Sequence, residues 1–216
     1  MSDANDYLQR DGGAILIDAG TIVTLQQDCV VRWHQHSVDE SGDDFLGIVA
    51  RQHAMNFRLW HEEDLARQPN ATDSQIASVK RNIDRLNQSR NDLIEQIDDL
   101  FAQALGVNGV NPDAQAPMNS ETLGSVIDRL SILSLRIYHY DEAVTRFADD
   151  ASQRERVSRR LKICHEQHLD LTNSLSLLIA DLSAGRKRHK TYRQFKMYND
   201  PALNPAIYLS QKRAAC

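Results

Sequence analysis

Apolar residues recur at three- and four-residue steps over five long segments of this chain, and this periodicity constrains the fold more than any other feature. Positions three, four, seven and eight apart share one face of an α-helix, so each segment would carry an apolar stripe. Such a stripe must be buried against other elements. The expected helices cover about Ala19–Gln35, Phe45–Arg67, Asp73–Leu105, Ser120–Asp149 and Ser152–Ser183.

Turn-forming residues separate these segments and define the domain organisation. Pro69 ends the second helix, and glycines, asparagines and prolines crowd residues 106–117. Long helices with short connections favour an antiparallel bundle. We therefore expect one all-α domain over residues 1–216, with an irregular N-terminus at 1–18 and a basic, partly irregular C-terminal segment at 185–216.

Several sequence features predict a cytoplasmic protein that is not inserted in a membrane. No apolar run approaches the roughly 20 residues of a membrane helix, and the N-terminus lacks the charge and hydropathy pattern of a signal peptide. The cysteines are odd in number and not spaced as C-x-x-C, so neither a disulfide framework nor a zinc site is expected. They are Cys29, Cys164 and Cys216.

Charge is distributed unevenly along the chain, whose net charge is −5. Residues 185–216 contain eight Lys and Arg but only one acid, Asp200, and the rest of the chain is strongly acidic. A basic segment on an acidic body either folds back onto that body or meets an anionic partner. We do not expect nucleic acid as the partner, because the acidic body would repel phosphate.

Ionisable residues lie on or beside the apolar stripes of four of the expected helices. Burying an unpaired charge is expensive, so such residues either pair with one another or line a hydrated pocket. Polar groups that converge in a mostly apolar cleft are typical of small-molecule sites. The residues concerned are Glu63, Arg90, Asp128, His139 and His168.

Each of these residues also has a purely structural interpretation. Glu63 and Arg90 could form an ion pair between helices, and Asp128 could belong to a solvated helix edge with its neighbour Arg129. His168 could be a core histidine that is hydrogen-bonded to a carbonyl or carboxylate. If a reaction occurs, the candidate acids and bases are Glu63, Asp128, His139 and His168. Whether the protein is an enzyme is left open.

Arginines and lysines near the stripes and in the C-terminal segment could hold a phosphate through charge-assisted hydrogen bonds. Tryptophan and asparagine side chains close by could contact the rest of such a ligand. The candidate ligand-binding residues are Trp60, Arg67, Asn87, Arg90, Asn91, Arg129, Arg188, Lys190 and Lys196.

No spacing of histidines and acids predicts a transition-metal site, so we expect no metal of that kind and no cofactor. Mg²⁺ stays open, because Glu95-x-x-Asp98 places two acids one helical turn apart and Glu63 and Asp64 lie on the preceding helix. That arrangement would suit an Mg²⁺-dependent all-α nucleotide pyrophosphohydrolase.

Four segments of the chain together resemble a bacterial family known as domain of unknown function 4254. They are Leu59–Arg67, Asp84–Glu95, Asn119–Leu133 continuing to His139, and Lys196–Pro201. The resemblance extends over roughly residues 22–205. The residues that the family pattern emphasises are Trp60, His61, Glu63, Asp64, Arg67, Asn87, Arg90, Asn91, Glu121, Asp128, Arg129 and His139.

The resemblance implies an all-helical protein that is often found together with glycosyltransferases of cell-envelope polysaccharide synthesis. It assigns no catalytic role to any residue of this chain. The leading hypothesis is therefore a cytoplasmic protein whose internal polar pocket binds a sugar phosphate or nucleotide sugar for that synthesis. The alternatives are the pyrophosphohydrolase and a non-catalytic protein that docks a glycosyltransferase. Association of the chain with itself also stays open.

Overall fold

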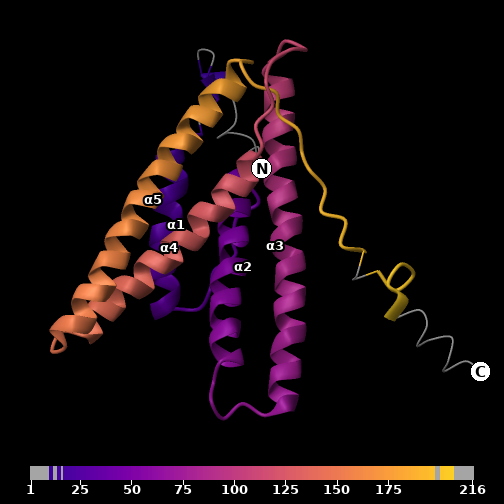
Figure 1. Ribbon diagram of the computed structural model, residues 1–216. Helices are drawn as coiled ribbons and strands as arrows, with labels where there is room; N and C mark the ends of the chain where they lie inside the picture. The colour runs from indigo at the N-terminus through magenta and orange to yellow at the C-terminus, as the bar shows by residue number, and fades with distance from the viewer. Residues whose placement is uncertain (1–9, 12–13, 16, 198–199, 207–216) are drawn as a thin grey trace, which may run out of the picture.

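The structure is a computed structural model that describes residues 10–11, 14–15, 17–197 and 200–206. Within these residues it contains five α-helices and one two-stranded antiparallel hairpin (Figure 1). The prediction of an all-α fold with five long helices is confirmed. The elements are β1 (Arg10–Asp11), β2 (Ala14–Ile15), α1 (Ala19–Gln35), α2 (Phe45–Ala66), α3 (Asp73–Val107), α4 (Leu123–Arg146) and α5 (Ala151–Ser183).

A capping side chain begins every one of these helices. In each case the oxygen of an aspartate or threonine accepts a hydrogen bond from the backbone N–H three residues later, which satisfies a donor that has no partner inside the helix. Thr72 and Gln75 form a reciprocal capping box at the start of α3. The caps of α1, α2, α3, α4 and α5 are Asp18, Asp44, Thr72, Thr122 and Asp150.

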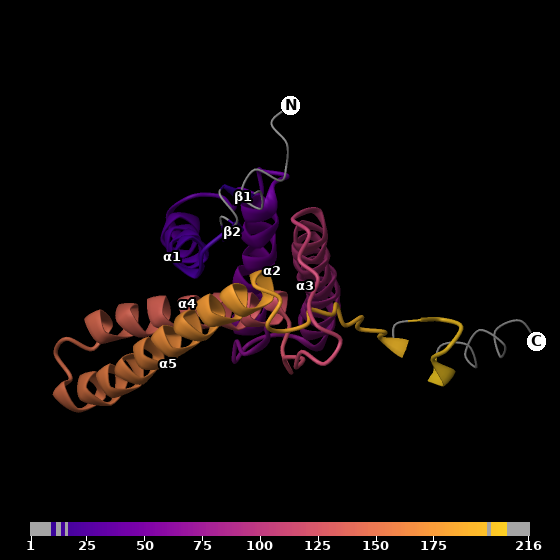
Figure 2. The same cartoon turned by 90° about the horizontal axis from the view of Figure 1, so that it is seen from above.

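The helices form two hairpins, α2 with α3 and α4 with α5, and α1 packs beside α4 (Figure 1). Neighbours within each hairpin are antiparallel. Figure 2 shows the α4–α5 hairpin crossing the α2–α3 hairpin steeply.

Two apolar clusters hold the hairpins together. The larger joins all five helices and includes Phe45, Ile97, Phe101 and Ile127, each fully buried. The smaller joins α1, α2 and α4 around Trp33, and it contributes one wall of the region described below. The central position predicted for the fourth helix is confirmed, because α4 supplies buried residues to both clusters.

The crossing of the two hairpins depends on a close approach at Gly124, near the start of α4. A Cβ atom at Gly124 would lie 2.6 Å from the carbonyl oxygen of Ile94 on α3. The Gly124 N–H also donates to the buried carboxylate of Asp98, at 2.7 Å. Burial raises the pKa of Asp98, although hydrogen bonds from Thr122 and Gly124 oppose that shift. Only glycine allows α4 to touch α3 in this way.

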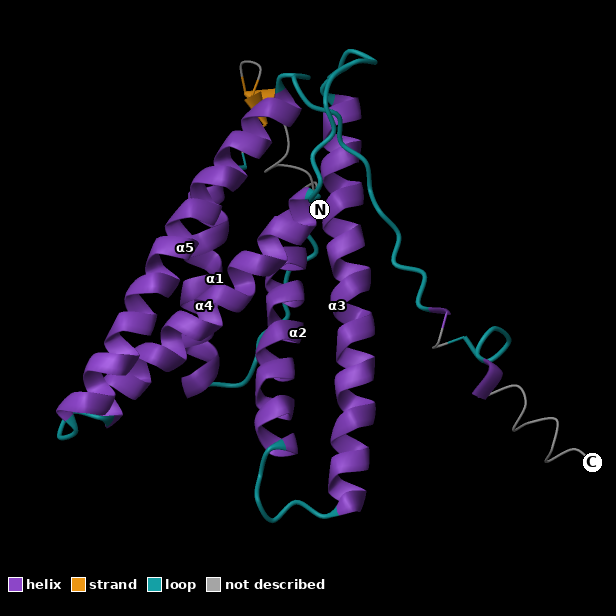
Figure 3. Cartoon of the chain, viewed as in Figure 1, coloured by secondary structure: helices purple, strands orange, loops and turns teal. Residues whose placement is uncertain are grey.

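The N-terminal residues depart from the expectation of irregular structure, because Arg10 pairs with Ile15 and Asp11 with Ala14 (Figure 3). The intervening pair Gly12 and Gly13 is a sequence typical of a two-residue hairpin. No helix among the described residues is both long and apolar enough to cross a lipid bilayer. Parts of the expected N-terminal and C-terminal segments lie outside the described residues, including Cys216.

Candidate functional site

The carboxylate of Asp128 on α4 is the centre of a buried polar network. Its Oδ1 atom accepts hydrogen bonds from Gln52 at 2.6 Å and Asn56 at 2.9 Å, both on α2. The guanidinium of Arg90 on α3 binds both carboxylate oxygens, at 2.7 and 2.5 Å. The Asp128 side chain is only 8% exposed. One carboxylate therefore ties three helices together, and the alternative of a solvated helix edge at Asp128 is wrong.

The network continues one turn along α4 to the hydroxyl of Ser131. Ser131 Oγ lies 2.9 Å from the Asn56 amide and 2.6 Å from Nδ1 of His53. His53 is fully buried and stacks on Trp33 at a centroid distance of 5.2 Å. Burial lowers the pKa of His53 to about 3, so the ring is neutral at pH 7.

A pocket of about 400 Å³ opens beside this network, between α2, α3 and α4. The volume is within the range of small-molecule sites. Four of the predicted ligand-binding residues line it, together with the candidate acid Glu63 and with Arg136, which apolar periodicity alone does not distinguish. The lining residues are Asn56, Leu59, Trp60, Glu63, Asp64, Arg67, Asn87, Arg90, Ile132, Leu135 and Arg136.

The three arginines of the pocket differ in how they are neutralised. Arg90 is bound to Asp128, and Arg67 forms an ion pair with Glu63 at 2.6 Å. The suggested ion pair between Glu63 and Arg90 is therefore wrong, because both residues have nearer partners. Arg136 makes no hydrogen bond or ion pair with any residue that the structure describes. Its guanidinium is the cation most available to a ligand.

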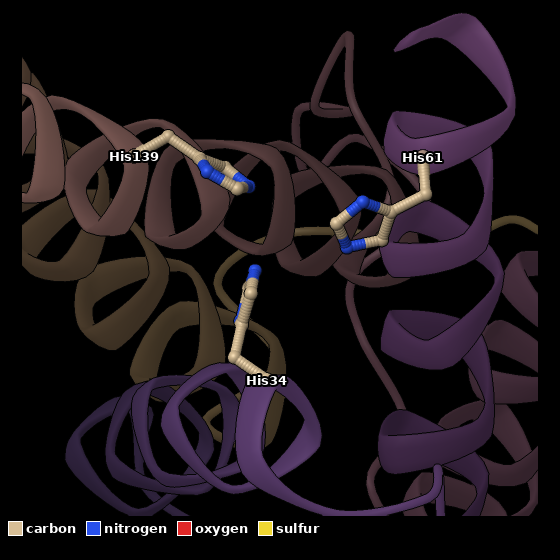
Figure 4. Close-up of side chains that lie close together, drawn as sticks. All are labelled: His34, His61 and His139. Atoms are coloured by element: carbon tan, nitrogen blue, oxygen red, sulfur yellow. The ribbon is translucent and has the colours of Figure 1, made fainter. Parts of the chain in front are cut away.

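A cluster of three histidines lies on the other side of Trp60. His34 of α1, His61 of α2 and His139 of α4 point toward one another (Figure 4). The His139 ring stacks on the Trp60 indole at a centroid distance of 4.6 Å and an interplanar angle of 8°. His139 therefore contacts the wall of the pocket without lining it. Periodicity had marked His139, but the positions of the three histidines in the chain gave no indication of this cluster.

The other predicted residues on α3, α4 and α5 lie apart from this pocket. His168 is buried on α5, as expected of a core histidine, but its Nε2 lies 3.4 Å from the hydroxyl of Ser134 and not beside the carbonyl or carboxylate that was expected. Arg129 pairs with Glu121 and lines a second pocket of about 450 Å³ between α4 and α5, which Arg136 also borders. Asn91 is buried on α3 and does not line the pocket beside Asp128.

The basic C-terminal segment crosses the end of the α4–α5 hairpin and then contacts the flank of α3. Arg188 donates to the carbonyl of Ala116, and Lys190 lies 5.7 Å from the ring centroid of Tyr192. Lys196 reaches the main-chain carbonyl of Asn87 at 3.3 Å. None of these three cations lines the pocket beside Asp128. The segment does not cover that pocket with positive charge.

The acids considered for Mg²⁺ are not brought together. Glu95 and Asp99 bind Arg193 of the C-terminal segment, while Asp98 faces Gly124. Glu62 on α2 lies beside Asn82 on α3. Glu95 follows Asn82 by thirteen residues along α3, a distance of roughly 20 Å at 1.5 Å per residue. Glu95 therefore lies far along α3 from the level of Glu62, Glu63 and Asp64 on α2.

The comparisons with known proteins give one match. A family model described as protein of unknown function (DUF4254) matches residues 46–191, about two thirds of the chain. The match includes all residues that line the pocket, and it excludes α1 and the last part of the C-terminal segment. No curated protein and no solved structure matches the chain.

Proposed function

The chain belongs to the DUF4254 family, and from the arrangement of its side chains we propose that it binds a small anionic ligand in the pocket between α2, α3 and α4. The ligand class is a sugar phosphate or nucleotide sugar. The observation that carries the proposal is the convergence of Arg67, Arg90 and Arg136 on one pocket that also contains Trp60.

The guanidinium groups provide the anion-binding part of this site. Phosphate accepts charge-assisted hydrogen bonds from arginine, and a planar guanidinium can bind two of its oxygens at once. Arg136 has no competing partner among the described residues, and Arg67 pairs with Glu63 in an exposed setting, where the ion pair is weak. Arg90 is held rigidly by Asp128, so its position is set before a ligand arrives.

The uncharged groups suit the rest of a sugar phosphate or nucleotide sugar. The indole of Trp60 offers an aromatic surface against which a sugar or a base can pack. Asn87 and Glu63 offer an amide and a carboxylate group for sugar hydroxyls. The polar network behind the pocket keeps these groups in place.

The pocket between α4 and α5 fits the proposed ligand less well. It is lined by Arg129, Arg136, Gln167 and Asp170 with three apolar residues, and no aromatic ring lines it. Arg129 is paired with Glu121 there. We therefore assign the ligand to the pocket that contains Trp60. The role in cell-envelope polysaccharide synthesis that the family resemblance implies is part of this proposal, as is the cytoplasmic location expected from the sequence, and docking of a glycosyltransferase stays a prediction.

A thermal-shift screen against sugar phosphates and nucleotide sugars tests the proposal. A ligand at 100 times its Kd should stabilise the folded state by about 2.7 kcal/mol. For a domain of this size that corresponds to a rise in Tm of roughly 5–10 °C. If no compound in the screen raises the Tm, the proposed ligand class is wrong.

Two matched variants locate the binding site. Arg67 and Arg129 each form an exposed ion pair with a glutamate at 2.6 Å, but only Arg67 lines the pocket with Trp60. Loss of a charge-assisted hydrogen bond to phosphate, worth about 1.5–3 kcal/mol, should weaken binding roughly 10- to 100-fold in Arg67→Gln. Arg129→Gln should bind as the wild type does. The reverse pattern would assign the ligand to the pocket between α4 and α5.

A further inference from the structure

Three histidines from three helices place ring nitrogens close enough together to share one ligand. One nitrogen of each of His34, His61 and His139 lies within 4.8 Å of the others (Figure 4). In tetrahedral zinc sites, nitrogen ligands at 2.0–2.1 Å from the metal are about 3.4 Å apart. Rotation of the rings about their broad terminal side-chain torsions can close this gap of about 1.4 Å or less without moving the helices.

The hydrogen bonds that the Nδ1 atoms donate determine which nitrogen of each ring is free to bind a metal. Nδ1 of His34 lies 2.7 Å from the carbonyl oxygen of Val30, which can only accept, so Nδ1 carries the proton. Nδ1 of His139 lies 3.4 Å from the carboxylate of Glu142 and is protonated for the same reason. The Nε2 atoms of both rings therefore have lone pairs available. Nδ1 of His61 lies 4.0 Å from the carboxylate of Asp64, which is too far for a hydrogen bond.

The Nε2 atoms of His34 and His139 are buried and have no hydrogen-bond partner among the described residues. An unsatisfied buried polar atom costs about 1–3 kcal/mol, so two of them facing one space require an explanation.

We propose that His34, His61 and His139 bind one Zn²⁺ ion through their Nε2 atoms. Imidazole nitrogen is a preferred zinc ligand, and three histidines leave a fourth position for water. Glu142 orients the His139 ring from the Nδ1 side, as carboxylates commonly do behind zinc-binding histidines. The metal joins α1, α2 and α4 at the end of the smaller apolar cluster.

This zinc site goes beyond the anion pocket and does not depend on it, because its test uses the metal alone. Protein stripped with a chelator should bind one equivalent of Zn²⁺ in a calorimetric titration. The Tm should rise with Zn²⁺, since the three histidines converge only in the folded state. Co²⁺ in place of Zn²⁺ should give the visible absorption of a tetrahedral site.

Variants at the ligands and at exposed histidines provide the control. His61→Gln and His139→Gln should each weaken Zn²⁺ binding at least about 100-fold, because loss of an outer-shell partner alone costs 10- to 100-fold. Glu142→Gln should weaken it roughly 10-fold. His36→Ala and His165→Ala, which remove exposed histidines outside the cluster, should bind as the wild type does.

Long-range ¹⁵N spectra of the eight histidines identify the ligating nitrogens directly. Zn²⁺ should shift the Nε2 resonances of His34, His61 and His139 and leave the other five rings unchanged. Absence of stoichiometric binding would mean that the cluster holds only water, and binding that survives in both His61→Gln and His139→Gln would place the metal elsewhere. Either result overturns the proposal.

Discussion

Arg90 and Asp128 should have a large coupling free energy, in contrast to the residues of the exposed ion pairs of the chain. The Asp128 carboxylate accepts four hydrogen bonds, two from Arg90 and one each from Gln52 and Asn56. The Asp128→Ala change leaves a guanidinium that is 24% exposed without its counter-charge, and two amides lose their acceptor. Breaking a buried pair in this way costs about 3–5 kcal/mol.

The reciprocal change, Arg90→Met, should cost less. Asp128 keeps the amide donors of Gln52 and Asn56, and the lost hydrogen bonds to a charged group are worth about 2–3 kcal/mol. In the double variant both the guanidinium and the carboxylate are gone, so no unpaired charge is left and only the amides of Gln52 and Asn56 lose an acceptor. Its cost should therefore not exceed that of Asp128→Ala alone, and the coupling free energy between the two positions should be at least about 2–3 kcal/mol.

Urea unfolding followed by far-UV circular dichroism measures these free energies, provided that the m-value is the same for all four proteins. The ion pair between Arg129 and Glu121 is the control. Its guanidinium nitrogen and carboxylate oxygen are 2.6 Å apart, about as close as in the buried pair, but the two side chains are 50% and 39% exposed. The same cycle there should give less than about 1 kcal/mol. A coupling below about 0.5 kcal/mol at Arg90 and Asp128 would show that the buried network does not hold the pocket together.

Two further predictions concern the residues that support the pocket. His53 is neutral in the folded state because its pKa is lowered to about 3. The unfolded chain takes up a proton on His53 below its ordinary pKa of 6.5, whereas the folded state does not. The free energy of unfolding is therefore unaffected by this group above pH 6.5 and falls as the pH drops from 6.5 toward 3. Between pH 7 and 4.5 the free energy of unfolding should fall by about 2–3 kcal/mol more in the wild type than in His53→Gln, and equal slopes would contradict the assignment. Gly124→Ala places a methyl 2.6 Å from the Ile94 carbonyl and should lower the free energy of unfolding by about 1–3 kcal/mol. Gly106→Ala, where nothing lies within 4 Å of the added Cβ, should not destabilise the fold, and a similar loss in both variants would refute the close-approach argument.

The helices could be predicted from the sequence because the signals that define them are local. Apolar periodicity and helix-breaking residues such as Pro69 placed most helix ends within a few residues of those observed. The exception is α4, which begins at Leu123 because Thr122 is its cap and ends at Arg146. The steep crossing of the hairpins depends instead on contacts between distant residues, such as Gly124 with Ile94, which have no local sequence signal.

The same distinction applies to the candidate site. A charge in an apolar stripe shows that a residue such as Arg90 or Asp128 needs a partner, and the periodicity identified both. It does not show which partner, because the choice between Glu63 and Asp128 depends on how α3 faces α2 and α4. The histidine cluster could not be predicted for this reason, since its members come from three helices and have no characteristic spacing.

Polar groups from α2, α3 and α4 surround the pocket that we propose binds an anionic ligand, and the two tryptophans of the chain can report whether a ligand occupies it. Trp60 lines the pocket, whereas Trp33 is buried in the smaller apolar cluster. In ¹H–¹⁵N spectra, titration with the nucleotide sugar or sugar phosphate that gives the largest Tm rise should shift the Trp60 indole resonance in a saturable way and leave that of Trp33 in place. An unchanged Trp60 resonance at saturating ligand would contradict the account.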